Sequence, residues 1–287
     1  MNDRIPIVLK ADGDCAYAEA LAAHLKTTLL HTTPDAPVWL SVDAAGLSLT
    51  DGDQAMRGDF TKLQKRLQYH NLTHELLVKA TKVKGRENLR VIDATAGMGE
   101  DSLLLAAAGC EVTLFEQDPV IAALLQDTMR RALEDAALHE IVMRMHLVEG
   151  DSIGHLRKLS DANMSLDTQF GTQGDDVGYD CSTLTASAAT MTGSDEALKR
   201  PNVIYLDPMF PERHKSGLVK KKFQLIHYLE APAENEEALM QAAIDARPFK
   251  IVVKRPAKGP YLAALKPSYS LDGKAIRYDC YVFPENA

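Results

Sequence analysis

Short apolar runs and longer Ala- and Leu-rich stretches alternate along most of the chain. The runs have the length of buried strands and lie at residues 5–9, 38–42, 91–93, 112–115, 143–148, 202–206 and 251–253. Several of the stretches between them place apolar residues three and four positions apart, as amphipathic helices do. Strands that alternate with helices predict an α/β protein built on a mostly parallel sheet.

Residues 90–118 contain the clearest unit of this pattern. The run that begins at Val91 ends on Asp93, and a turn of small residues with Gly97 and Gly99 follows. An Ala- and Leu-rich helix and a second apolar run come next, and that run ends on Glu116. This succession of strand, glycine turn, helix, strand and acid is typical of a nucleotide-binding βαβ unit.

The residue types in this unit favour a cationic ligand. A dinucleotide fingerprint is absent, because Ser102 stands where its third glycine would be. Asp93 would repel a pyrophosphate but suits an amino group, and Glu116 can accept hydrogen bonds from a ribose diol. S-adenosylmethionine carries an ammonium, a sulfonium and a ribose, so the unit predicts a site for it. A tight turn in any α/β protein is the alternative reading.

A second chemical signal follows the run at residues 202–206. The segment Asp207-Pro208-Met209-Phe210-Pro211 resembles the [DN]-P-P-[FY] loop of methyltransferases that act on exocyclic amines. Such an amine is a poor nucleophile, because its lone pair is delocalised into the ring. Asp207 and the Pro208 carbonyl can accept its two N–H bonds, and Phe210 can stack on the base. These three are the predicted catalytic residues, and a proline-rich connecting loop is the alternative.

The charge distribution changes what the net charge suggests. The formal net charge of −8 in 287 residues argues against a nucleic-acid partner. Residues 160–198, however, hold seven acids and no Lys or Arg, whereas residues 57–90 carry nine Lys and Arg against three acids. From residue 199 to the end there are fifteen against ten. Local basic faces attract phosphates, although solvated helix faces are the alternative for each region.

Several classes of protein are disfavoured by what the sequence lacks. No stretch approaches the roughly 20 apolar residues of a membrane span, and the first residues do not have a signal-peptide pattern. The four cysteines contain no C-x-x-C pair, which is typical of a reducing compartment. His70 and His74 lie four positions apart without a third ligand nearby. We therefore expect a cytoplasmic protein with no membrane partner and no metal.

A resemblance to the RsmJ family is carried by the stretches VIDATAGMGEDSLLLAAAGCEV, LFEQDPVIAALL, VIYLDPMFPERHKSGLVKK and VVKRP. Members of that family are bacterial methyltransferases that modify guanine N2 of small-subunit (16S) ribosomal RNA with S-adenosylmethionine. The resemblance covers most of residues 56–159 and 201–284, and the first 55 residues more loosely. It implies a class I, Rossmann-like methyltransferase fold with a seven-stranded, mostly parallel sheet and 16S ribosomal RNA or the small ribosomal subunit as partner.

The chain is expected to have three parts. Residues 1–55 form a small N-terminal α/β subdomain with a helix over 16–30 and a hairpin turning at 43–46. Residues 56–89 form a basic helical connector, and residues 90–287 form the methyltransferase domain. A polar, acidic insert at 160–200 interrupts that domain. Its later part is predicted to contain a surface helix over 233–246 and a terminal antiparallel hairpin.

The site residues follow from the motifs and the resemblance together. The predicted cofactor-binding residues are Asp93, Gly97, Gly99, Glu100, Asp101, Glu116, Gln117, Asp151, Ser152 and Asp207. Basic residues beside the acceptor loop and after the fifth strand of this domain are predicted to contact RNA; they are Arg213, Lys215, Lys220, Lys221, Lys222, Lys254 and Arg255. Two other functions stay open: methylation of adenine N6 or of a glutamine amide, and RNA binding without catalysis on the same fold.

Overall fold

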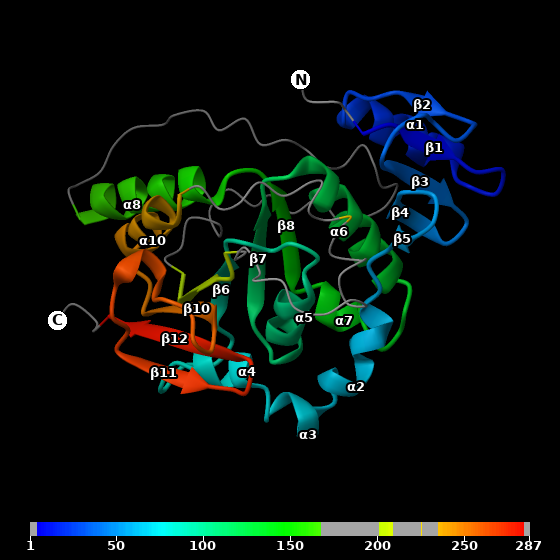
Figure 1. Cartoon of the computed structure of the whole chain (residues 1–287). Coiled ribbons are helices and arrows are strands. Elements are labelled where there is room, and N and C mark those ends of the chain that lie inside the picture. The colour runs from blue at the N-terminus through cyan, green and yellow to red at the C-terminus, as the bar shows by residue number, and fades with distance from the viewer. Residues whose placement is uncertain (1–4, 168–200, 209–224, 226–234, 284–287) are drawn as a thin grey trace.

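The computed structural model describes residues 5–167, 201–208, 225 and 235–283. Its strands form two sheets, one of five strands and one of seven. The smaller sheet is N-terminal and lies beside helix α6 (Pro119–Ala132), which packs on the larger sheet (Figure 1). Its elements are β1 (Ile7–Leu9), α1 (Cys15–His24), β2 (Leu29–Leu30), β3 (Trp39–Asp43), β4 (Gly46–Thr50) and β5 (Ala55–Met56). The strand order is β2-β1-β3-β4-β5.

The first helix is shorter than the sequence predicts. Asp14 caps α1 by accepting the Tyr17 N–H at 3.0 Å, and the helix ends at His24. Lys26 then takes a positive φ of 51°, which breaks the helical path. Leu29 and Leu30 instead pair in parallel with β1 as β2. The prediction of a helix over 16–30 is wrong here, because Leu-rich composition does not separate a helix end from a short strand.

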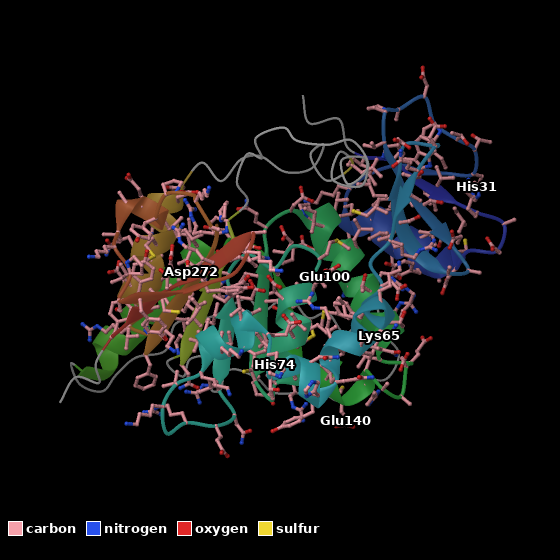
Figure 2. The ribbon with its side chains drawn as sticks, turned by 60° about the horizontal axis from the view of Figure 1, so that its bottom comes forward. His31, Lys65, His74, Glu100, Glu140 and Asp272 are labelled. Atoms are coloured by element: carbon pink, nitrogen blue, oxygen red, sulfur yellow. The ribbon has the colours of Figure 1, made fainter. Side chains whose placement is uncertain are left out.

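The connector consists of short helices. They are η1 (Phe60–Leu63), α2 (Gln64–Leu67), α3 (Tyr69–Leu72) and α4 (Leu76–Thr81). Their apolar side chains pack beneath them, while Lys65 and His74 lie on the outer side shown in Figure 2. The rings of His70 and His74 are edge-on with centroids 5.2 Å apart. This segment therefore covers one face of the larger sheet and leaves basic side chains outside.

The larger sheet has the order β11-β12-β10-β9-β6-β7-β8. Its strands are β6 (Arg90–Asp93), β7 (Glu111–Glu116), β8 (Met145–Glu149), β9 (Val203–Leu206), β10 (Lys250–Pro256), β11 (Tyr269–Asp272) and β12 (Ile276–Val282). The strands from β6 to β10 are mutually parallel, and β12 is antiparallel to both of its neighbours. The predicted seven-stranded, mostly parallel sheet is confirmed.

Helices cover both faces of this sheet (Figure 1). They are α5 (Glu100–Ala107), α6 (Pro119–Ala132), α7 (His139–Val142), α8 (Ser152–Asp167), α10 (Glu236–Asp245) and the short η3 (Leu262–Ala264). One apolar core lies under α4, α5 and α7, and a second lies under α8 and α10. None of the helices in the described ranges is long and apolar enough to cross a membrane.

Two helices differ from the sequence expectation. The helix predicted at the surface over 233–246 is α10, whose Leu239 and Met240 are buried against the sheet. Helix α8 runs to Asp167 and so occupies the first part of the predicted insert at 160–200. Residues 168–200 lie outside the described residues. The weak periodicity after residue 160 hid the continuation of the helix.

Candidate active site

A cavity of about 820 Å³ lies at the carboxyl ends of β6, β7, β9 and β10. The strand order reverses at β6, which has β7 on one side and β9 on the other. Open α/β sheets bind ligands at such a switch point. Residues 56–60 and 62 of the connector form a further wall, which the sequence did not indicate.

The glycine turn after β6 shapes the floor of this cavity. Gly97 and Gly99 have positive φ values of 53° and 74°, which favour glycine over residues with a side chain. A Cβ at Gly99 would lie 2.6 Å from Leu125 Cδ1, whereas a Cβ at Gly97 would meet no atom within 4 Å. Gly99 thus packs against α6, and Gly97 leaves room on the cavity side for a ligand.

Asp93 supports this turn from below. Its side chain is 1% exposed and accepts hydrogen bonds from Ser102 Oγ at 2.6 Å and from the Thr95 N–H at 3.1 Å. Burial raises the pKa of Asp93 to about 7. Both carboxylate oxygens therefore hold the loop, and any contact with a ligand's amino group would be additional to these bonds.

Glu116 ends β7 at the opposite wall. It accepts the N–H of Gly97 and the N–H of Asp118, each at 2.9 Å, and burial raises its pKa. The neighbouring walls are apolar and include Phe115 and Ile121. A carboxylate beside an apolar slot suits a ribose attached to an aromatic base.

The remaining predicted cofactor residues in this part of the chain also line the cavity. They are Glu100, Asp101, Gln117, Asp151 and Ser152. Asp151 additionally caps α8 by accepting the N–H groups of Ile153 and Gly154 at 3.0 and 3.1 Å. Asp151 therefore both caps α8 and lines the cavity.

A charged network lies at the mouth of β9 and β10. Lys254 Nζ donates to Asp101 Oδ2 and to Asp207 Oδ2, both at 2.8 Å. Tyr205 donates its hydroxyl to Asp101 Oδ2 at 2.6 Å, and the Asp207 N–H donates to Thr95 Oγ1 at 2.6 Å. Burial raises the pKa of Asp207, and the ammonium of Lys254 opposes that rise.

Two of the residues predicted to contact RNA lie in or beside this network, and the structure contradicts the prediction only for Arg255. Lys254 is ion-paired in the cavity wall instead of lying on an open basic face. Arg255 is 1% exposed and donates to the Pro260 carbonyl and to Glu236, so the prediction that it contacts RNA is wrong. Alternation along β10 places these neighbours on opposite faces. The segment Lys254-Arg255-Pro256 suggests an exposed basic surface, but both cations are ion-paired within the fold.

The acceptor loop is described as far as Pro208. Pro208 is buried and lines the cavity. Phe210 and the basic residues Arg213, Lys215, Lys220, Lys221 and Lys222 lie outside the described residues. Their roles stay predictions.

The sequence reasoning missed Thr95 and Tyr205. Tyr205 stands two positions before Asp207, so strand alternation could have placed both on one side of β9. The neighbouring position of Lys254 follows from the register of β9 and β10, in which Val253 pairs with Leu206. Thr95 had no comparable signal, because its hydroxyl acts on a loop 112 residues further along the chain.

Comparison with known proteins decides the family. The model of a family described as putative SAM-dependent methyltransferases matches residues 23–170 and 178–283. Ribosomal RNA small subunit methyltransferase J of Thioalkalivibrio sulfidiphilus is 37% identical over 98% of this chain and 99% of the relative. The protein of the same name from Pseudomonas fluorescens Pf-5 is 36% identical over 97% and 94%. The chain belongs to this methyltransferase family.

A solved structure agrees with the family. The SAM-dependent methyltransferase from Neisseria gonorrhoeae has 27% identity and a TM-score of 0.69, over 98% of this chain and 97% of that chain. The protein is therefore an S-adenosylmethionine-dependent methyltransferase with a class I fold. The cavity fits that cofactor, because it combines the open side of Gly97, the carboxylate of Glu116 and an apolar slot.

Proposed function

We propose that this protein methylates the exocyclic N2 amine of a guanine in 16S ribosomal RNA, either free or in the small ribosomal subunit. The name of the curated relatives, ribosomal RNA small subunit methyltransferase J, supports the RNA substrate. The resemblance to the RsmJ family supports guanine N2. A ribosomal substrate also supports a cytoplasmic location.

The position of Asp207 carries the proposal. This carboxylate ends β9 at the cavity, directly before Pro208, and Lys254 holds it at 2.8 Å. A carboxylate in this place can accept an N–H bond from an aromatic amine, which orients the nitrogen. The Pro208 carbonyl is the proposed acceptor of the second N–H, and Phe210 is the proposed stacking partner of the base.

Residues of the cavity are proposed to hold the cofactor around this point. Glu116 would accept the ribose hydroxyls, and the turn with Gly97 and Gly99 would lie against the methionine part. Asp151 and Ser152 would face the base, with Phe115 beside it. Glu100, Asp101 and Gln117 complete the proposed cofactor site together with Asp93 and Asp207.

S-adenosylmethionine supplies a methyl group on a positively charged sulfur. When bound, the cofactor would supply its methyl carbon to the amine nitrogen, and the electron pair of the broken carbon–sulfur bond would return to sulfur. Positive charge develops on the nitrogen, and the Asp207 carboxylate stabilises it electrostatically. The nitrogen then loses one proton to the Asp207 carboxylate and, through it, to solvent. Lys254 keeps that carboxylate ionised before transfer.

Labelled methyl transfer tests the proposal. Small subunits and their naked RNA from a strain without this gene would be incubated with protein and methyl-labelled S-adenosylmethionine, and the nucleosides would be separated. We expect the label in N2-methylguanosine. Label in N6-methyladenosine or in protein would overturn the substrate, and binding of the RNA without any transfer would favour the non-catalytic alternative.

A further inference from the structure

A second cavity lies at the other end of β10 from the cofactor cleft. It measures about 440 Å³, a volume typical of pockets that hold small ligands. Lys250 begins β10 at this cavity, whereas Lys254 on the same strand lies in the cleft. Four strand residues span about 13 Å. The two cavities are therefore close enough for one polynucleotide to reach both.

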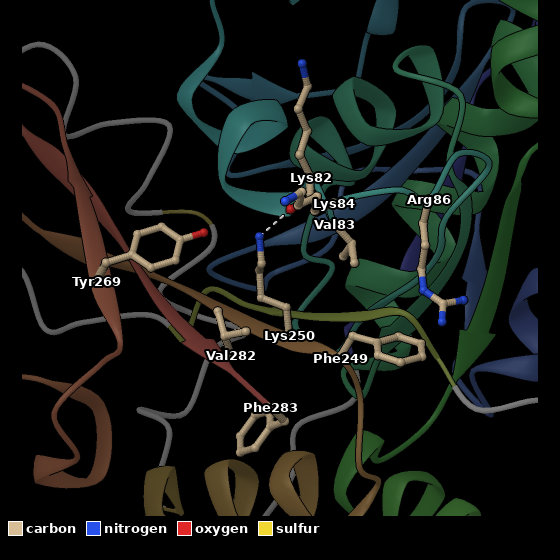
Figure 3. A pocket seen from close by; sticks show the side chains of 9 residues that line it. All are labelled: Lys82, Val83, Lys84, Arg86, Phe249, Lys250, Tyr269, Val282 and Phe283. Atoms are coloured by element: carbon tan, nitrogen blue, oxygen red, sulfur yellow. Dashed lines mark hydrogen bonds between the residues drawn. The ribbon is translucent and has the colours of Figure 1, made fainter. Parts of the chain in front are cut away.

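Cationic and aromatic side chains line this cavity, and none of the described residues that line it carries a carboxylate (Figure 3). The basic loop after α4 contributes Lys82, Lys84 and Arg86. Tyr269 of β11 and Phe249, directly before β10, contribute aromatic rings. Lys82 and Lys84 are exposed, and neither forms an ion pair with a described residue. Their charges are thus available to an anion from outside.

Lys250 fixes the basic loop in this place. Its side chain is buried, and its ammonium donates to the Ala80 carbonyl at 3.0 Å and to the Lys82 carbonyl (Figure 3). The same ammonium lies 5.8 Å from the centre of the Tyr269 ring. A buried lysine that holds backbone carbonyls and an aromatic ring pre-organises the cavity before any ligand arrives.

Two aromatic rings lie on either side of the cavity. Tyr269 is 41% exposed, and burial of its hydroxyl end raises its pKa to about 12, so the phenol stays neutral. On the other side the Arg86 guanidinium lies 4.0 Å above the centre of the Phe249 ring. Of the two rings, Tyr269 is the exposed one. An exposed ring beside lysines suits a single-stranded nucleic acid, because bases stack on rings and phosphates pair with ammonium groups.

We propose that this cavity binds an unpaired nucleotide of the RNA substrate, with Tyr269 stacking on the base and Lys82 and Lys84 contacting phosphates. The proposal rests on the proposed function, because it assumes an RNA substrate. It adds a second RNA contact at the opposite end of β10 from Asp207. Binding there would orient the RNA while the target guanine occupies the cleft.

RNA binding by charge-matched variants tests the cavity. Binding of the naked RNA and of the small subunits described above would be measured over a range of salt, using whichever probe the wild type binds. We expect Lys82→Gln/Lys84→Gln to bind RNA roughly tenfold more weakly than the wild type at low salt. The slope of log affinity against log salt concentration should become shallower by between about one and two, which corresponds to one or two fewer counterions released. Lys10→Gln/Lys158→Gln, which removes two exposed charges elsewhere, should change both much less.

The stacking contact has its own pair of variants. Tyr269→Ala should bind RNA about 5- to 100-fold more weakly, and Tyr269→Phe should bind as the wild type does. Affinity for S-adenosylmethionine should be unchanged in every variant, which shows that the fold persists. If Lys82→Gln/Lys84→Gln and the control pair bind RNA equally well and the wild type transfers the methyl group normally, the proposed nucleotide site is wrong while the proposed function stands. Failure of the wild type to bind RNA would overturn the proposed function as well.

Discussion

Lys254 is the residue on which the electrostatics of the candidate active site depend. Its ammonium lies between Asp101 and Asp207, and the partial burial of all three side chains strengthens their interaction. The pKa of Asp207 is raised by burial and by Asp101, and it is lowered by Lys254 and Arg255. The ammonium of Lys254 therefore keeps the proposed amine acceptor ionised.

Removal of this ammonium should change the pH dependence of the reaction. Lys254→Met raises the pKa of Asp207 further, so Asp207 holds its proton up to a higher pH. We expect the acidic limb of the kcat profile to move to higher pH, while Lys254→Arg moves it less. Single-turnover rates at saturating RNA would measure both profiles. An unmoved acidic limb in Lys254→Met would contradict this role.

Substitution of Asp207 tests the mechanism directly. Asp207→Asn keeps one acceptor oxygen but loses the charge, and Asp207→Ala loses both. We expect kcat to fall in the order wild type, Asn, Ala, with a total loss on the order of 10²–10³. RNA affinity should change little, because phosphate contacts supply most of it. Near-wild-type turnover by Asp207→Ala would remove this residue from the mechanism.

Asp93 should make the stability depend on pH. Its pKa is about 7 in the folded protein, against an ordinary 3.8, so between these values the folded state holds a proton that the unfolded chain has lost. The contribution of Asp93 to the free energy of unfolding is full below about pH 4 and falls as the pH rises through 7. From pH 5 to pH 7 the free energy of unfolding of the wild type should therefore fall by about 2 kcal/mol more than that of Asp93→Asn. Denaturant titrations of both proteins at pH 5 and pH 7 would measure these free energies. If the difference between the wild type and Asp93→Asn is the same at both pH values, the pKa of Asp93 is not raised.

Helix α6 is the element that joins the two sheets. Its buried Asp127 accepts the Leu47 N–H from β4 at 3.0 Å and pairs with Arg130 and Arg131 at 2.9 and 2.8 Å. Leu124 of the same helix is part of the N-terminal core. One face of α6 packs on the N-terminal sheet and another packs on the larger sheet. The N-terminal sheet is therefore held next to residues 56–60, which form a wall of the cleft.

Asp127→Ala should loosen this junction. The loss leaves the buried Leu47 N–H without an acceptor and removes the carboxylate that pairs with Arg130 and Arg131, which should cost about 2–4 kcal/mol. Trp39 is the single tryptophan and lies in β3, so its fluorescence reports the N-terminal sheet. We expect the Trp39 transition in denaturant to precede loss of helical circular dichroism. In Arg130→Ala, whose side chain is 41% exposed, the two transitions should still coincide.

At the scale of the whole molecule, the net charge is negative although parts of the chain are basic. The acidic residues Asp175, Asp176, Asp180, Asp195 and Glu196 lie in a stretch without bases up to residue 198. The basic connector and the second cavity lie elsewhere in the chain. Long-range repulsion from the acids should therefore weaken a binding surface that is locally basic.

Neutralising these five acids should strengthen RNA binding. Replacement of the four aspartates by Asn and of Glu196 by Gln changes the formal net charge from −8 to −3. We expect affinity for RNA to rise severalfold at low salt and the gain to vanish above about 0.5 M salt, because screening then removes the repulsion. Titrations at both salt concentrations would show this. A gain that persists at high salt would point to a direct contact instead.

The sequence alone determined the alternation of strands and helices in the larger domain, the parallel βαβ unit and the family. Those properties depend on periodicity, turn residues and motifs that lie within about thirty positions of one another, as in the unit from Val91 to Glu116. Strand ends carry the chemistry of such sheets, so the positions of Asp207 and Glu116 at the ends of apolar runs were enough to assign both to a cleft.

Only the tertiary structure decided which distant residues meet. Lys254 contacts Asp207 across 47 residues, Asp127 binds the Leu47 N–H across 80, and Lys250 binds the Ala80 carbonyl across 170. Strand order and helix packing create these contacts, and neither leaves a mark in local composition. Arg255 shows the same limit, because the KRP segment that predicts an exposed cation instead lies in a central strand, where the side chain is buried and paired. The burial of a charged group depends on everything packed around it, which no short stretch of sequence contains.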